Sequence, residues 1–279
     1  MSHTKVTSGK FTWKLHSFLK DNLDHLIKAN KNDWDFKLLV SGDGMTRTGK
    51  TTIAVQCAAY LDDTFIENWK ERMIFDGQGL IKVSQTLKKG SAIVYDEARE
   101  GLDSKKQMER YTKNLLDFFS QCGNLNLYIF IVLPDFFELP KSIAVVQTMF
   151  LINCHTKDGF ERGYFEFYNR RSKKGLYIKG SRYLDYKSWK PSFKGTFTKF
   201  FPIPRKEYEE RKTTKLAQLR KRESASQSRK QAETHRNRCS ILIDKFREGG
   251  WKVKEIAQLL GVDTGTIHHT YKSLKVKNE

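Results

Sequence analysis

The sequence predicts an α/β domain, in which a parallel sheet carries helices on both faces, with a basic β-hairpin extension and a small all-α domain at the C-terminus. Three observations support this prediction. Apolar, strand-like runs alternate with stretches of helical spacing between residues 34 and 152, the pattern of successive right-handed βαβ units. A glycine-rich loop separates the first of these runs from its helix. After Gly159 the sequence changes to an alternating, aromatic-rich run, Phe160 to Tyr168, which is followed by a strongly basic turn.

The composition fits one sizeable domain and an appendage. Hydrophobic residues make up 38% of the 279 residues, which is enough to build a core. No apolar run approaches the ~18–20 residues that span a membrane, and the first residues lack a signal-peptide core. The four cysteines show no spacing typical of a zinc site or a disulfide framework. We therefore expect a protein of the reducing cytoplasm (the host's, if the chain is viral) with no membrane insertion.

Changes of composition divide the chain into four parts. We expect an N-terminal helical extension over residues 1–33, a nucleotide-binding domain over 34–204 that includes a basic hairpin at 160–180, a basic linker over 205–238 and a helical domain over 239–279. The linker has almost no apolar residues, so we expect it to be mobile or a solvated helix.

The positive charge is unevenly placed. The chain has a net charge of +19, yet residues 1–154 hold 20 Lys or Arg against 18 Asp or Glu. Residues 155–202 hold 12 against 4, and residues 203–279 hold 19 against 10. This asymmetry indicates a polyanionic partner, nucleic acid before membrane. The alternative is a basic surface that serves only solubility.

The glycine-rich loop has the sequence G-x-x-x-x-G-K-T, which is the phosphate-binding loop, or Walker A motif. Its backbone amides and the following helix N-terminus would hold phosphates. Lys50 would reach the β- and γ-phosphates, and the Thr51 hydroxyl would ligate Mg²⁺. The expected nucleotide-binding residues are Gly44, Met45, Thr46, Arg47, Thr48, Gly49, Lys50, Thr51 and Thr52.

A second motif follows about 40 residues later, in the run Ser91 to Glu97. Four small or apolar residues lead into two carboxylates, as in a Walker B strand. Asp96 at the strand's carboxyl end would hold Mg²⁺, and Glu97 would orient and deprotonate the attacking water. The alternative is that the pair simply ends a strand and caps the next helix.

The apolar run Leu125 to Leu133 predicts a fourth strand, buried on both faces and lying between the two motif strands. The run ends in Pro134-Asp135, so a residue that senses the γ-phosphate would be Asp135 or a neighbour such as Asn126. Val145 to Ile152 predicts a fifth strand.

The basic hairpin would pair Phe160–Tyr168 with Leu176–Ile178. Its tip would contact a phosphate backbone through Arg170, Arg171, Lys173 and Lys174, or send an arginine into a neighbouring subunit's nucleotide. The alternative is a solvated turn whose charges protect an exposed sheet edge.

The C-terminus has helix-turn-helix spacing. Ile241 starts a first helix, Val253–Leu260 forms a second, Gly261 permits the turn, and a third helix begins at Thr264. A bundle for protein contacts would share this pattern. The residues that would face DNA are Thr264, Thr266, His268, His269 and Lys272.

Together these motifs resemble the ASCE group of P-loop ATPases from about residue 34 to residue 180. Within that group the chain looks most like the FtsK/HerA-type motors, which include zonular-occludens-toxin-like and viral DNA-packaging ATPases. The resemblance implies Lys50, Thr51, Asp96 and Glu97 in the roles given above. It also implies a homo-oligomeric ring, often a hexamer, that moves double-stranded DNA, with an arginine finger supplied in trans. Pro134 stands where the family usually has an amide. The finger candidates are Arg162, Arg170 and Arg171.

The sequence therefore supports one main hypothesis, an ATP- and Mg²⁺-dependent DNA translocase or packaging-type motor from a virus or mobile element. The alternative is a nucleotide-switched, AAA+-like initiator, loader or transcription regulator that binds a specific DNA site. A third reading is an ATPase that acts on protein and binds no DNA.

Overall fold

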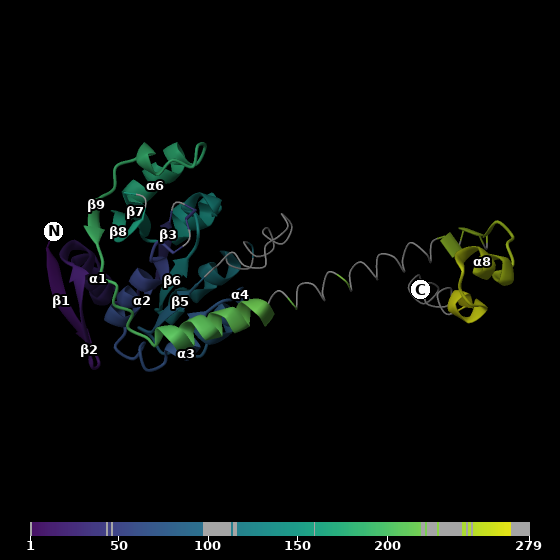
Figure 1. Cartoon of the computed structure of the whole chain (residues 1–279), viewed down its shortest axis with the longest axis horizontal. Helices are drawn as coiled ribbons and strands as arrows, with labels where there is room; N and C mark the ends of the chain where they lie inside the picture. Colours follow the sequence, from purple (N-terminus) through teal and green to yellow (C-terminus); the bar gives the residue numbers. More distant parts are fainter. Residues whose placement is uncertain are drawn as a thin grey trace. The chain divides into compact units, whose positions relative to one another are not determined.

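The structure is a computed structural model, and it separates into two compact units, residues 1–216 and 217–279 (Figure 1). None of its described helices combines the length and apolar composition needed to span a bilayer. The residues that it describes are 2–42, 44–45, 47–96, 113, 116–158, 160–218, 221, 228, 242–243, 245–246, 248 and 249–268.

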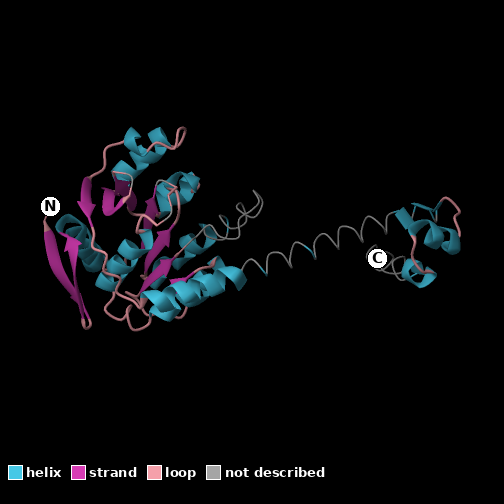
Figure 2. Ribbon diagram, viewed as in Figure 1, coloured by secondary structure: helices cyan, strands magenta, loops and turns pink. Residues whose placement is uncertain are grey.

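A seven-stranded sheet forms the centre of the first unit, in the order β4-β5-β6-β3-β7-β8-β9. Figure 2 draws the strands as magenta arrows. The pairings from β4 through β7 are all parallel, and β8 and β9 extend the sheet antiparallel. The predicted parallel α/β sheet is confirmed, and so is the position of the fourth strand between the two motif strands. The strands are β3 (Phe36–Gly42), β4 (Met73–Ile74), β5 (Ala92–Tyr95), β6 (Tyr128–Val132), β7 (Leu151–Lys157), β8 (Glu161–Tyr168) and β9 (Phe193–Thr196).

Helices cover both faces of this sheet because its central strands are apolar on both sides. Every residue of β3 is buried, and its side chains alternate between two cores. Leu38 and Val40 pack with α1 (Ser17–Asn30) and α2 (Lys50–Leu61). Leu39 packs on the other face, with α4 (Gly77–Ser84), α6 (Arg170–Gly180) and helical residues 116–121.

The N-terminal prediction of a helical extension is wrong for residues 3–16. These residues form a β-hairpin of β1 (His3–Ser8) and β2 (Phe11–His16), and only then does α1 begin. Trp13 and Leu15 are buried while Thr12 and Lys14 are exposed. This alternation with a period of two is typical of a strand. The sequence did not reveal it because the segment is short and rich in polar residues.

The predicted hairpin over 160–180 is also wrong. The partner of β8 is β7, with Leu151 opposite Tyr168, and residues 170–180 form α6. Asn169 caps this helix, since its side-chain oxygen accepts a hydrogen bond from the Ser172 N–H at 2.9 Å. The predicted fifth strand is shifted as well: residues 142–147 form a single π-helical stretch, η3 (Ser142–Gln147), and β7 begins at Leu151.

The first part of the expected mobile linker is instead a helix that packs on the first unit. Residues 205–218 are helical, and Tyr208 is buried in the main core beside Ile203. An ion pair of 2.8 Å between Lys70, in the short helix α3 (Trp69–Arg72), and Glu207 also holds it. The boundary between units therefore falls after Leu216 and not at Pro204.

The second unit has a small apolar core, made of Ile243, Ile256, Ala257 and Ile267. Helix α8 (Val253–Leu260) ends at Gly261, whose φ of 66° is left-handed. Helical residues 264–268 follow, and the Thr266 N–H donates to Asp263 Oδ1 at 2.8 Å at their start. The function of this unit in DNA binding stays a prediction, and His269 and Lys272 lie outside the described residues.

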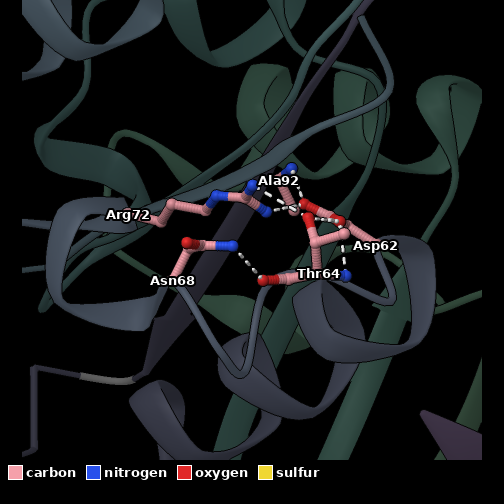
Figure 3. A network of polar contacts seen from close by, with 5 residues as sticks. All are labelled: Asp62, Thr64, Asn68, Arg72 and Ala92. Carbon is pink, nitrogen blue, oxygen red and sulfur yellow. Dashed lines mark hydrogen bonds and ion pairs between the residues drawn. The ribbon is translucent and has the colours of Figure 1, made fainter. Parts of the chain in front are cut away.

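A buried network fixes the end of α2 to the start of β5 (Figure 3). Asp62 pairs with the Arg72 guanidinium and accepts the Ala92 N–H at 2.8 Å, while Thr64 Oγ1 accepts from Arg72 at 2.8 Å. Both ionic side chains are less than a tenth exposed. Removing one partner from such a pair typically costs about 3–5 kcal/mol, because the other charge stays buried. The network thus sets the position of β5, the strand that leads into Asp96, from its amino end.

Lys173 was predicted to contact DNA, but its side chain is fully buried. It lies in α6, and its ammonium group donates to the Thr148 carbonyl oxygen at 2.6 Å and to Thr148 Oγ1 at 2.5 Å, just past the end of η3. Burial, and then the nearby Arg170 charge, lower the pKa of Lys173 from 10.5 to about 7. Lys173 is therefore a structural residue of the first unit.

This burial predicts a pH dependence of stability. Between about pH 7 and the ordinary lysine pKa, the unfolded chain binds more protons than the folded one, so the Lys173 contribution to the free energy of unfolding rises with pH. Over this range we expect the free energy of unfolding of the wild type to rise relative to that of Lys173→Met, by up to about 1.4 kcal/mol per pH unit. Urea unfolding at several pH values measures the difference. The control is Lys174→Met at the exposed neighbour, which should show the same pH dependence as the wild type. Parallel curves of unfolding free energy against pH for the wild type and Lys173→Met would contradict the lowered pKa of Lys173.

Candidate nucleotide-binding site

The phosphate-binding loop leaves the carboxyl end of β3 and turns directly into α2. Three of its residues have left-handed φ values: 73° at Gly44, 61° at Arg47 and 97° at Gly49. A Cβ at Gly49 would lie 2.7 Å from the Phe197 ring, so glycine is required there both by backbone conformation and by space. Gly49 is also the N-cap of α2, and it offers no side-chain cap to the first-turn amides. With no acidic residue in that turn, the helix start suits an anion.

The Lys50 ammonium group lies inside the curve of the loop. Its Nζ donates to the Met45 carbonyl oxygen at 2.6 Å and lies 3.5 Å from Thr48 Oγ1. A Cβ at Gly42 would be 3.2 Å from this nitrogen, so Gly42 leaves room for the lysine. Of the remaining predicted residues, Thr52 is buried in α2, and Thr46 lies outside the described residues.

The two sequence motifs meet at Asp96. The Thr51 hydroxyl donates to Asp96 Oδ1 at 3.2 Å, although the two residues are 45 positions apart. Asp96 is 1% exposed, and its backbone N–H donates to the Ile74 carbonyl oxygen at 2.8 Å, which fixes the end of β5 against β4. Glu97, the expected catalytic base, lies outside the described residues.

Two further residues contact Asp96, and the sequence did not indicate them. The Tyr208 hydroxyl donates to Asp96 Oδ2, and the Lys212 ammonium lies 3.2 Å from the same oxygen. Both come from the helix over 205–218. Tyr208, Lys212 and Leu216 recur every four residues, so they share one helix face. This spacing could have indicated a packed helix face in the sequence, but most of the surrounding residues are charged, which is typical of a solvated helix.

Tyr186 joins the start of the phosphate-binding loop to the end of β6. Its hydroxyl lies 3.1 Å from the Gly42 carbonyl oxygen and 2.8 Å from Asp135 Oδ1, and it accepts the Phe136 N–H at 2.9 Å. Burial is the main reason that the pKa of Tyr186 is raised. The sequence around Tyr186 gave no indication of this role.

The structure also separates the two sensor candidates. Asp135 follows the carboxyl end of β6. Its carboxylate contacts the Tyr186 hydroxyl, which also contacts Gly42 at the start of the loop, so Asp135 lies beside the loop. Asn126 precedes β6, at the opposite edge of the sheet, and its side chain donates to Asp33 at 2.7 Å. Only Asp135 therefore lies at the edge where the nucleotide would bind.

The basic candidates are spread over the first unit. Arg162 is exposed near the start of β8. This end of β8 pairs with the carboxyl end of β7, where Cys154 lies opposite Gly42 of β3. Arg162 therefore lies at the same edge of the sheet as the loop. Arg170 and Arg171 are exposed at the start of α6, at the opposite edge. Lys174 is exposed there too, whereas Lys173 is buried. In the second unit, Thr264, Thr266 and His268 are exposed within the last described helix.

The residues present fit a magnesium–nucleotide complex. The Thr51 hydroxyl and the Asp96 carboxylate form an oxygen pair beside a loop shaped for phosphate. Mg²⁺ is usually held by one or two such groups and by the nucleotide's own phosphates. The part of the chain that the structure describes contains no cluster of three or more His, Cys, Asp or Glu that could hold a metal by itself.

Neither a protein-family model nor a curated protein sequence matches the chain. Among solved structures, the N-terminal domain of zonular occludens toxin from Neisseria meningitidis aligns over 63% of this chain and 98% of its own length. The identity is 14% and the TM-score 0.35. A likeness this distant carries no argument about fold or function, so both rest on the strand order and the site itself.

The Tyr186 contacts give a testable prediction for the loop. Tyr186→Phe removes the hydroxyl that pairs with the Phe136 N–H and with Gly42 or Asp135, leaving buried polar groups without that partner. We expect the free energy of unfolding to fall by about 1–3 kcal/mol. The control Tyr183→Phe changes a tyrosine that is 74% exposed, and it should stay within about 0.5 kcal/mol of wild type. Equal urea midpoints for the two variants would show that Tyr186 does not hold the loop.

Proposed function

We propose that this chain binds and hydrolyses ATP with Mg²⁺ and couples hydrolysis to double-stranded DNA, as an oligomeric translocase or packaging-type motor. The observation that carries the proposal is the Thr51–Asp96 contact at 3.2 Å. It joins a phosphate-binding loop after β3 to a carboxylate after β5, with β6 between the two strands. This arrangement suits ATP hydrolysis better than storage of a nucleotide, because an acidic residue, Glu97, follows the metal ligand directly.

Each residue would have a distinct part in the reaction. The amides of the loop and of the first turn of α2 bind the β- and γ-phosphates, and Lys50 moves from the Met45 carbonyl oxygen to these phosphates. Thr51 and Asp96 hold Mg²⁺, which when bound neutralises charge on the phosphate oxygens. Glu97 accepts a proton from the attacking water. Arg162, at the same edge of the sheet, is the finger candidate best placed to reach a neighbouring subunit's nucleotide.

The DNA partner is supported by charge. Residues 155–279 carry most of the net charge of +19, and Arg170, Arg171 and Lys174 are exposed together on α6. The second unit adds a small helical core with exposed polar residues at the start of the last helix that the structure describes there. Affinity that depends steeply on salt is expected of such a surface, because each phosphate contact releases counterions.

The proposal is tested by steady-state ATP hydrolysis, with and without double-stranded DNA, near physiological salt. We expect DNA to stimulate hydrolysis in the wild type. Glu97→Gln should abolish turnover and keep ATP binding, since the loop is unchanged. Asp63→Asn, which alters an exposed carboxylate away from the site, is the matched control and should behave as wild type.

Two results would contradict the motor. Equal rates with and without DNA at low salt would exclude coupling. Slow hydrolysis indifferent to DNA, combined with tight binding to one DNA sequence that is lost on deleting residues 239–279, would favour the nucleotide-switched regulator.

A further inference from the structure

The helix over 205–218 places a cation on the metal-binding carboxylate. Lys212 Nζ is 3.2 Å from Asp96 Oδ2, and Tyr208 donates its hydroxyl proton to the same oxygen. Asp96 is almost fully buried, whereas the Lys212 side chain is 21% exposed. A buried carboxylate needs a compensating charge, and in this structure Lys212 provides one from outside the sequence motifs.

Tyr208 and Lys212 differ in how firmly they are held. Tyr208 is 6% exposed, and its ring packs against Phe75 and Phe201 with centroids 6.2 and 5.4 Å apart. It is therefore part of the core. Lys212 reaches Asp96 on a flexible four-carbon side chain, and its ammonium lies 5.9 Å from the centroid of the Tyr208 ring. Lys212 can leave Asp96 without disturbing the core, and Tyr208 cannot.

A magnesium ion held by Thr51 and Asp96 would lie close to this ammonium group. Two cations beside one buried carboxylate repel each other strongly, because the surroundings screen charge far less than water does. Occupation of Asp96 by Lys212 and by Mg²⁺ is thus competitive.

We propose that Lys212 is the exchangeable counter-ion of Asp96: it pairs with the carboxylate until Mg·ATP displaces it, and its release loosens the helix over 205–218. The inference rests on the proposed binding of Mg·ATP at this site. It adds a regulatory residue outside the two motifs, on a helix that packs on the first unit.

The helix that carries Lys212 runs without a break through residue 218, past the boundary that follows Leu216. A residue that reports on the metal site therefore lies on the segment that precedes the second unit in the sequence.

The experiment compares Lys212→Met with Lys215→Met in the full chain. Lys215 is exposed on the same helix, so the control removes an equal charge away from Asp96. Equilibrium binding of a fluorescent ATP analogue is measured with Mg²⁺ and with EDTA. We expect Lys212→Met to bind the Mg²⁺ complex about tenfold more tightly than the control, because the competing cation is gone. Binding in EDTA should be the same in both variants.

Hydrogen exchange supplies a second measurement that is independent of affinity. In the wild type, amides over residues 208–216 should exchange faster with the Mg²⁺–analogue complex than with the analogue in EDTA. In Lys212→Met they should exchange fast in both conditions. Equal Mg²⁺-dependent affinities in the two variants, with unchanged exchange of the helix, would overturn the inference alone. No analogue binding by the wild type under any condition would overturn the proposed function, and this inference with it.

Discussion

The parallel pairing of β3 with β6, and of β6 with β5, is the constraint on which the candidate site depends. It aligns Val40 with Val132 and Tyr95 with Ile131, so the chain leaves β3 and β5 at one edge of the sheet. The phosphate-binding loop and Asp96 then have to meet there, although they are far apart in sequence. Burial of these strands on both faces stabilises the pairing, and the Asp62–Arg72 network holds β5 from its other end.

Residues far downstream complete the site. Phe197 packs on Gly49, Tyr186 bonds to the start of the loop, and Tyr208 and Lys212 contact Asp96. All of them lie beyond the antiparallel strand β8. The loop, the Asp96 carboxylate and the helix over 205–218 thus form one packed structure. If a nucleotide binds as proposed, a change at the site can reach this helix without any long relay of intermediate contacts.

The sequence predicted the parts of the site that have a fixed spacing, namely the loop, the carboxylate and the strand between them, because phosphate and metal binding demand particular residues there. It failed where tertiary packing overrode the local pattern. Leu176–Ile178 resembles a strand, but the Asn169 cap and the burial of Lys173 make it helical. The helix over 205–218 looked like a solvated segment, since its few core contacts are separated by charged residues. Only the folded chain shows which face of that helix is buried.

The most direct test of this account is the structure of the protein with Mg²⁺ and a non-hydrolysable ATP analogue. The account predicts phosphates within the loop between Gly42 and Lys50, with Lys50 turned from the Met45 carbonyl oxygen toward them. It also predicts the metal at Thr51 and Asp96, with Lys212 no longer paired to the carboxylate. A nucleotide bound elsewhere, or bound while Lys50 keeps its contact with Met45, would contradict it.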